Sequence, residues 1–430
     1  MFSFLHRSNP LSYLTQTLSS LTPRPITLPN VSVHDIETLP DKRTRTLKHL
    51  VKANHHNHSI IYHDLQFANH APHILGSAYL FGATGEHLND VYESEGGRLE
   101  GWRDSPGEVG GEGGEWRRWL GEREYQRAFV DFFEDQLVQH GYDWRDLLKA
   151  YLFEGEKPLI NNMICGLAHP LIHLGYGYEL SCRTIAIEAL ALACCFHNFM
   201  SKYLDDPSYT KPANPSLAST SPLELLSKIA QDKRFNLFSH PNSDNIAHLF
   251  EKQEAAVLEY WNGWELTSPQ KQFEDSQKTA AALLVGTHGS DNKYDFFAVH
   301  LLTSSHAVRI LLPLIPAEFQ LPLIRQWWLF TIAVYIAQLR PTIDIKEIEE
   351  YEVRERRWEW VAKTALTGRY SLDAHYVKAL RAMKEAAETW AESGEFFLKA
   401  AVKFADEFSG WGGFGQNSEA AKEVEDGERN

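Results

Sequence analysis

Apolar residues recur along this chain at spacings of three and four residues, and this period constrains the possible fold more than any other feature. Such spacing gathers apolar side chains on one side of an α-helix. The pattern is strongest in the segments 179–200, 246–264, 277–285, 296–312, 323–339 and 373–408. The alternation of apolar and polar residues that marks a half-buried β-strand is scarce. We therefore predict an all-α fold, a mainly α-helical single large domain with few or no strands and no internal repeats.

Loops and composition divide the 430 residues into three parts. We predict an N-terminal arm at residues 1–44, a helical domain at 45–409 and a flexible C-terminal tail at 410–430. Inside the domain, loops are expected at 94–115, which is rich in Gly and Glu, and at 205–221, which is rich in Pro and Ser. The 43% of hydrophobic residues, with 12 Trp, 17 Tyr and 23 Phe, can form a deep, aromatic-rich core.

Charge and cysteine usage exclude several classes of function. With 42 Lys and Arg against 57 Asp and Glu, the formal net charge is −15, which argues against nucleic-acid and anionic-membrane partners. The most apolar run, 327–339, is far shorter than the roughly 20 residues that span a bilayer. The cysteines are Cys165, Cys182, Cys194 and Cys195. They lie in apolar sequence without Cys-x-x-Cys spacing, so we interpret them as buried free thiols of an intracellular protein.

The N-terminal arm has an unusual composition. Residues 1–34 contain no Asp or Glu, but they hold Arg7, Arg24 and many Ser and Thr. This weakly resembles an organelle transit peptide, whereas the charged-then-apolar pattern of a secretory signal is missing. We favour an arm that is disordered or draped over the domain, and we expect a soluble, cytoplasmic protein.

The chain contains 20 histidines, and six of them fall within nineteen residues. These six are His55, His56, His58, His63, His70 and His73. Neutral imidazole is the commonest protein ligand for metal ions, so the clustering suggests a metal site. Surface histidines also occur in runs, and we expect His55 to His63 to be of that kind.

Two histidine pairs are built alike. His70 and His73, and likewise His169 and His173, stand with a proline just ahead of an apolar run. Because proline is tolerated in the first turn of a helix, both pairs are predicted at helix N-termini. The positive end of the helix dipole disfavours imidazolium and keeps the rings neutral for a metal. Capping and core hydrogen bonding is the alternative for one such pair, but two pairs of the same construction favour metal binding.

Two later helical segments present further histidines. His300 lies in apolar sequence that also carries the hydroxyl groups of Thr303 and Ser304. His375 stands near the start of the last long helical segment and shares a helix face with Lys378, three residues later. Alone, such a histidine is more often a hydrogen-bonded core residue, and such a lysine a solvated charge. If Lys378 faces inward, its amine must be neutralised, paired or modified.

The order of these motifs resembles the questin oxidase-like family of fungal secondary metabolism. The matching blocks are Asn-His-x-x-His at 69–73, Phe-Gly-Ala at 81–83, His-Pro-Leu-Ile-His-Leu-Gly-Tyr-Gly-x-Glu at 169–179, Asp-Phe-Phe-x-x-His at 295–300 and Asp-x-His-x-x-Lys-x-x-Arg-Ala at 373–382. The resemblance spans about residues 45–405. Ala68 departs from the pattern, since many members carry another histidine there, and Leu372 stands where a second acidic residue is common. These departures bear on the substrate more than on metal binding.

The resemblance implies a mononuclear non-heme iron oxygenase that opens a ring of an anthraquinone-type aromatic polyketide. The chemistry is either a Baeyer–Villiger-like oxygen insertion or a dioxygen-dependent carbon–carbon cleavage. It implies Fe(II) as the cofactor, the polyketide and dioxygen as partners, NADPH as an external reductant, and a lysine carboxylated by carbon dioxide as an oxygen ligand. Carried over to this sequence, the candidate metal ligands are His70, His73, His169, His173, His300, His375 and Lys378.

Seven candidates exceed the ligands of one iron, so some must orient ligands or meet the substrate. No block offers an inward Asp or Glu beside its histidines, and a carboxylated Lys378 would supply the missing negative charge and hard oxygen donor. Thr303, Ser304 and Tyr176 are candidate catalytic hydroxyls in an aromatic-walled pocket. No Gly-x-Gly-x-x-Gly motif follows a predicted strand, so we expect no dinucleotide domain, and NADPH would reduce the substrate or act through another protein.

Two other classes of function stay open. A zinc-dependent hydrolase or lactonase is possible in principle, because histidines with a carboxylated lysine also suit hydrolytic sites. That class predicts stoichiometric zinc and no oxygen uptake. A non-catalytic helical scaffold that binds small molecules predicts no bound metal, and it predicts that His173 and His300 can be replaced without loss of ligand binding.

Overall fold

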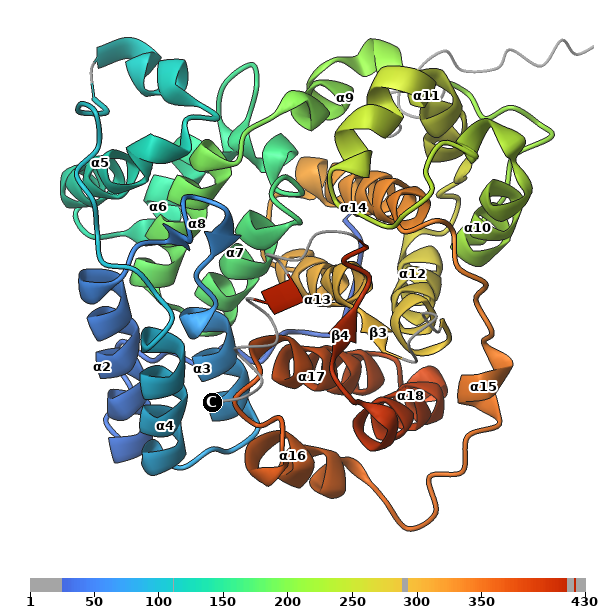
Figure 1. Cartoon of the computed structure of the whole chain (residues 1–430). Helices are drawn as coiled ribbons and strands as arrows, with labels where there is room; N and C mark the ends of the chain where they lie inside the picture. The colour runs from blue at the N-terminus through green and yellow to red at the C-terminus, as the bar shows by residue number, and fades with distance from the viewer. Residues whose placement is uncertain (1–24, 111, 288–292, 416–420, 423–430) are drawn as a thin grey trace, which may run out of the picture.

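The computed structural model describes residues 25–110, 112–287, 293–415 and 421–422, and helices dominate this part of the chain (Figure 1). Its strands form two small sheets. In one, β1 (Ile61–Tyr62) pairs antiparallel with β2 (Phe67–Ala68), and in the other, β3 (Tyr294–Asp295) pairs parallel with β4 (Trp411–Gly412). The predicted all-α class is confirmed.

Helix α13 (Phe296–Leu311) runs through the middle of the molecule (Figure 1). Every residue from Phe297 to Leu311 is buried. A helix that is buried on all sides requires partners on all sides. The helices packed against it are α7 (His169–Glu179), α12 (Pro269–Val285), α14 (Ala317–Ala337) and α17 (Ala374–Thr389).

The remaining helices form groups around this centre (Figure 1). One group is α2 (Lys42–Asn57), α3 (Ala71–Leu80) and α4 (Gly85–Gly96); a second is α5 (Gln126–Gln139), α6 (Trp144–Leu148) and α8 (Arg183–Cys195). A third contains α9 (Lys202–Asp205), α10 (Pro222–Gln231) and α11 (Asn245–Gly263), and a fourth α15 (Lys346–Glu349), α16 (Trp358–Thr367) and α18 (Gly394–Glu407). Short turns of helix are η1 (Glu112–Trp119), η2 (Arg123–Tyr125), η3 (Lys149–Phe153), η4 (Leu159–Asn162), η5 (Phe199–Ser201), η6 (Pro207–Tyr209), η7 (Lys233–Phe235) and η8 (Ala391–Ser393).

Two segments that were predicted as single helices differ in the structure. Most of the segment 179–200 forms α8, which begins only at Arg183 and ends at Cys195, and Ser181 ahead of it adopts a φ of 48°. The segment 373–408 turns at Trp390, whose φ of −118° and ψ of 79° are not helical, and α18 then packs back against α17. Both parts keep apolar residues at helical spacing, so the period alone does not reveal the turn.

Both ends of the described chain contribute to the core. Trp411 and Phe414 are buried, so the first residues of the predicted tail pack against the domain through β4. On the other side, Ile26 and Leu28 are buried and α2 already begins at Lys42. Most of the segment compared with a transit peptide lies outside the described residues, and the division into arm, domain and tail stays a prediction.

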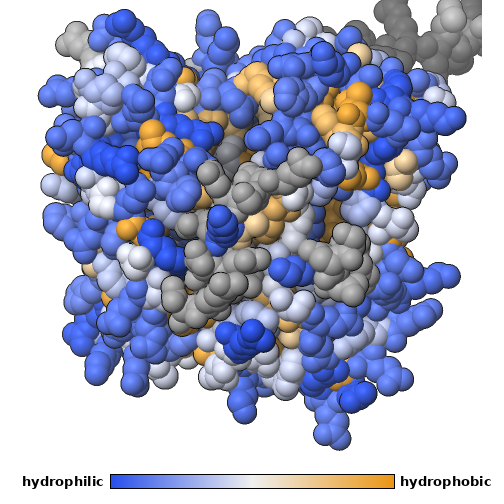
Figure 2. Space-filling model, in the orientation of Figure 1, coloured by the Kyte–Doolittle hydropathy of each residue, from blue (hydrophilic) through white to orange (hydrophobic). Residues whose placement is uncertain are grey.

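The face seen in Figure 2 is mostly hydrophilic, and apolar residues reach it in small separate patches. No single helix within the described ranges combines the length and the apolar character that a membrane crossing requires. Of the helix pairs in the described ranges, α8 with residues 199–205 is the one that is long and apolar enough when taken together, and the two parts are bent by 94°. All four cysteines are buried and free, as predicted. The cytoplasmic location stays a prediction.

Candidate metal centre

Four of the predicted histidines meet in the interior, each from a different helix. His70 is the N-cap of α3, His169 is the first residue of α7, His300 lies in α13 and His375 in α17. Their candidate ligand atoms all lie within 4.8 Å of one another, and no side chain in the group is more than 9% exposed. No Asp, Glu or Cys belongs to this group among the residues that the structure describes.

Backbone carbonyl groups fix the tautomer of two of these rings. Nδ1 of His169 donates to the carbonyl oxygen of Gly166 at 2.6 Å, and Nδ1 of His300 donates to that of Phe296 at 2.9 Å. A neutral imidazole with its proton on Nδ1 presents a lone pair on Nε2, as a metal ligand must. Nε2 of His300 and Nε2 of His375 are buried and have no hydrogen-bond partner within the described ranges.

The distances within the group fit a bound metal ion. Imidazole nitrogens bind such ions at about 2.1 Å, which places neighbouring ligands about 3 Å apart and opposite ligands about 4.2 Å apart. Nε2 of His70 lies 2.8 Å from Nε2 of His169, as expected for neighbouring ligands, and all four candidate ligand atoms lie within 4.8 Å of one another, close to the span of one coordination sphere. A buried polar atom without a partner costs about 1–3 kcal/mol. A metal ion would supply the partner that Nε2 of His300 and Nε2 of His375 lack among the described residues.

Lys378 lies one turn after His375 on α17, and its charge acts on the pKa values of all four clustered histidines. Its side chain is 0% exposed, and Nζ has no hydrogen-bond partner within the part of the chain described. Burial lowers the pKa of Lys378 to about 7, although the charges of Asp373 and Glu95 act to raise it. A large fraction of this amine is therefore uncharged at neutral pH, and only the uncharged amine reacts with carbon dioxide.

The four clustered histidines are held in the neutral form. Burial is the largest cause that lowers their pKa values, and it brings the pKa of His169 to about 3. The charge on Lys378 is the second cause for His70, His169 and His375, and the neighbouring His169 is the second cause for His300. The sequence predicts neutral rings because of the helix dipole, whereas in the structure burial is the main cause of the lowered pKa values.

Each predicted histidine pair contributes one residue, His70 or His169, to this group. The other residue of each pair, His73 or His173, belongs to a second, hydrogen-bonded arrangement that ends at Glu188. Nε2 of His73 lies 2.9 Å from Nδ1 of His173, and Nε2 of His173 lies 2.8 Å from Oε2 of Glu188. Because the carboxylate accepts, His173 carries its proton on Nε2 and accepts from His73 through Nδ1. Nδ1 of His73 is then a lone pair, and it is buried without a partner among the described residues. The ring of His73 lies edge-on to His70, with 5.5 Å between centroids.

His55 connects this arrangement with the surface. Its two ring nitrogens lie 2.7 Å from Oε1 of Glu188 and 3.1 Å from Oε1 of Glu134. Burial alone would lower the pKa of His55, but the hydrogen bonds to both carboxylates outweigh it and raise the pKa to about 9. Burial raises the pKa of Glu188, yet the bonds from His173 and His55 lower it to about 2. The prediction of a surface histidine is wrong for His55 and confirmed for the exposed His56.

Gly175 allows α7 and α13 to approach closely behind the cluster. A Cβ atom at this position would lie 3.0 Å from Cβ and 3.1 Å from Cα of Ala307. The same approach brings the rings of His169 and His300 to 5.0 Å between centroids. A larger residue at position 175 would separate the helices that carry these two histidines.

A cavity of about 450 Å³ opens beside the cluster and is lined in part by His70 and His169. Six phenylalanines contribute to its walls beside aliphatic and polar residues, namely Phe67, Phe196, Phe199, Phe296, Phe297 and Phe330. Ligand-binding pockets commonly measure about 300–1,000 Å³ and combine apolar walls with a few polar groups. The cavity can therefore hold a flat aromatic molecule against two of the clustered histidines.

None of the three predicted pocket hydroxyls lines this cavity. Thr303 and Ser304 donate to carbonyl groups of their own helix, at 3.1 and 3.2 Å. The hydroxyl of Tyr176 lies 2.6 Å from Oγ of Ser77 in the core. Contact of these residues with substrate stays a prediction, and the observed geometry gives it no support.

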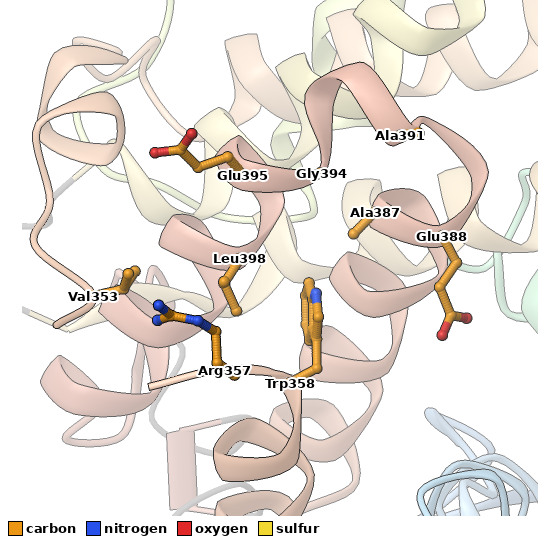
Figure 3. A pocket seen from close by; sticks show the side chains of 9 residues that line it. All are labelled: Val353, Arg357, Trp358, Ala387, Glu388, Ala391, Gly394, Glu395 and Leu398. Carbon is orange, nitrogen blue, oxygen red and sulfur yellow. The ribbon is translucent and has the colours of Figure 1, made fainter. Parts of the chain in front are cut away.

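A second hollow, of about 470 Å³, lies between α16, α17 and α18 (Figure 3). In this view Arg357 and Trp358 stand at its lower side, Glu395 at the upper left and Glu388 at the right (Figure 3). Its lining contains no histidine and no cysteine. This hollow is therefore separate from the histidine cluster.

Comparison with known proteins adds a family relationship. Residues 67–383 match the sequence model of a family described as questin oxidase-like. A Baeyer–Villiger oxidase of Pestalotiopsis microspora is 26% identical over 377 residues, which cover 80% of this chain and 82% of that protein. A Baeyer–Villiger oxidase of Emericella nidulans is 24% identical over 389 residues (84% and 85% covered). The questin oxidase of Aspergillus fumigatus is 24% identical over 373 residues (81% and 82% covered).

Proposed function

The chain belongs to the questin oxidase-like family, and from this premise we propose that it is a non-heme iron-dependent oxygenase that oxidatively opens a ring of an anthraquinone-type aromatic polyketide. The names of the relatives, Baeyer–Villiger oxidase and questin oxidase, support an oxidoreductase that opens rings in fungal polyketide pathways. One observation supports metal dependence most directly, namely the convergence of four neutral histidines, with Lys378 one turn after His375 buried and without a hydrogen-bond partner in the described part of the chain.

His70, His169, His300 and His375 would hold the iron through their ring nitrogens. Lys378 would add an oxygen donor after carboxylation, in which the neutral amine and carbon dioxide form a carbamate and release one proton. This reaction converts a neutral amine into an anionic carbamate and so offsets part of the charge of a divalent ion. Bound there, Fe(II) would supply electrons to dioxygen, as in other non-heme iron oxygenases.

The other residues of the centre position these ligands. Glu188 fixes the tautomer of His173 and, through it, that of His73, whose ring contacts His70. Hydrogen-bonded groups behind metal ligands commonly change metal affinity 10- to 100-fold. The phenylalanines of the cavity would stack on the ring system of the polyketide and keep water away from it. His70 and His169 form the wall where the reacting ring would lie.

The stoichiometry depends on which reaction occurs. Insertion of one oxygen atom into a ketone consumes O₂, two electrons and two protons, and it yields an ester and one water molecule. NADPH would supply these electrons from outside, or the hydroquinone form of the substrate would. A dioxygenase reaction would place both oxygen atoms in the product and would need no added reductant.

Oxygen consumption by iron-loaded protein tests this function. Protein purified without oxygen is loaded with Fe(II), mixed with a panel of anthraquinones under ¹⁸O₂, and analysed with an oxygen electrode and by mass spectrometry. We expect iron-dependent oxygen uptake and ¹⁸O in a ring-opened product, and loss of both in His300→Ala but not in the surface control His56→Ala. Stoichiometric zinc with lactone hydrolysis and no oxygen uptake would contradict the proposal.

A further inference from the structure

Arg123 places a guanidinium group on the wall of the cavity beside the cluster. It is the first residue of η2, just before α5. Nη1 donates to the carbonyl oxygen of Leu65 at 2.9 Å, and the guanidinium carbon lies 4.9 Å from the centroid of the Phe196 ring. Phe196 also lines the cavity, so the guanidinium is held in position at two points.

Among the residues that the structure describes, no carboxylate pairs with Arg123. Asp244 lines the same cavity, but within the described ranges no acidic oxygen lies within 4.0 Å of the Arg123 guanidinium. Arg127, four residues later, makes a useful contrast, because it also stacks on a ring, Trp102 at 4.9 Å, and yet pairs with Asp131. An arginine has five N–H donors, and Arg123 uses one of them.

An unpaired guanidinium on an aromatic wall selects for a particular ligand. Its planar fork matches the two oxygen atoms of a carboxylate, and such charge-assisted pairs are stronger than neutral hydrogen bonds. The chain has a net charge of −15, so a local cation is needed to draw an anion into the cavity. The adjoining phenylalanines would meanwhile contact the apolar rings of the same molecule.

We propose that Arg123 is a specificity-determining residue that binds a carboxylate substituent of a flat aromatic substrate. A carboxylate held there would decide which part of the ring system reaches His70 and His169 on the same cavity. The inference rests on the proposed function for the aromatic nature of the ligand. It concerns binding alone and therefore requires neither iron nor turnover.

Two matched probes test this assignment in the metal-free protein. Anthraquinone-2-carboxylate and the neutral anthraquinone-2-carboxamide share a ring system and differ in charge, and their dissociation constants follow from quenching of tryptophan fluorescence. We expect the full-length protein to bind the carboxylate about tenfold more tightly than the amide, the effect of one charge-assisted hydrogen-bonded pair. Arg123→Gln should bind both probes about equally, whereas the control Arg127→Gln should keep the preference.

The ratio of the two constants separates recognition from a structural role. Arg123 also tethers the β1–β2 turn at Leu65, so a purely structural substitution would weaken both probes alike and leave the ratio unchanged. That result would overturn the proposal, and so would failure of the unchanged protein to bind either probe or to prefer the carboxylate. Failure of the proposed function differs from this, because it would appear as absence of iron or oxygen uptake with the carboxylate preference intact.

Discussion

Replacing Lys378 with methionine should stabilise the metal-free protein. The amine is fully buried without a partner among the described residues, and methionine fills a similar volume without an ionisable group. Burial lowers the pKa of Lys378 from 10.5 to about 7, a difference of about 3.5. Each unit corresponds to about 1.36 kcal/mol. At pH 7 the lysine therefore costs the folded state about 4 kcal/mol, which Lys378→Met should recover in part or in full.

The stability of the unchanged protein should also depend on pH, in a direction set by the lowered pKa of Lys378. Between pH 7 and 10.5 the unfolded chain holds a proton on this lysine that the folded chain has lost, so the stability of the unchanged protein rises with pH. The gain between pH 7 and 9 should be roughly 2 kcal/mol, and it should be absent from Lys378→Met. His55 acts in the opposite direction, because its pKa is raised to about 9 in the folded state and its contribution is lost as the pH rises through that value. The contribution of His55 is the same in the unchanged protein and in Lys378→Met, so it cancels when the stabilities of the two proteins are compared.

Urea unfolding of metal-free protein at pH 7, 8 and 9 measures the effect, with tryptophan fluorescence as the signal and buffers kept free of carbon dioxide so that the amine stays unmodified. Lys403→Met is the matched control, because Lys403 is also buried but bonds with Glu407 and Glu347. This control should lose stability. Parallel pH dependences for the unchanged protein and Lys378→Met would refute the reasoning that a buried, unpartnered amine lies at this position.

Three further outcomes follow from the same geometry. Glu188→Gln should lower the free energy of unfolding by about 3 kcal/mol, because it breaks the ion pair with His55 and weakens the buried hydrogen bond from His173. An unchanged urea midpoint would contradict this. Gly175→Val should lower both the iron content and the melting temperature, because the valine side chain would meet Ala307 on the neighbouring helix. Normal iron content in this variant would argue against that contact. Adding Fe(II) anaerobically should stabilise the protein by about 2.7 kcal/mol at a free concentration 100 times Kd, and calorimetry that finds no shift would speak against a folded-state site.

Much of the fold follows from local patterns that the sequence displays. Apolar periodicity predicts α13 almost to its ends, and the proline beside each histidine pair predicts the starts of α3 and α7. The four clustered histidines are all among the predicted ligands, because each stands in or beside an apolar helical run that must turn inward. The division of the segment 373–408 into two helices is not predictable from the period, since the apolar spacing continues on both sides of the turn at Trp390.

The parts of the site that escaped prediction depend on packing between distant segments. Glu188 lies 15 residues after His173 and 133 residues after His55. No local spacing therefore indicates that these three residues meet. Arg123 resembles any solvated arginine until the fold places it on the cavity wall. His70 belongs to the histidine cluster and His73 to the hydrogen-bonded arrangement with His173 and Glu188. This division likewise depends on which helix faces each ring. Such contacts are set by tertiary structure, and a single sequence carries no signal for them.

Iron bound per chain is the measurement that tests the central proposal most directly. The unchanged protein, Lys378→Ala and the control Lys384→Ala, which removes a partly exposed lysine of the same helix, are loaded with Fe(II) without oxygen and with bicarbonate, and are then freed of excess metal. The account predicts about one iron per chain in the unchanged protein and in the control, and little in Lys378→Ala. Full iron occupancy in Lys378→Ala would contradict it.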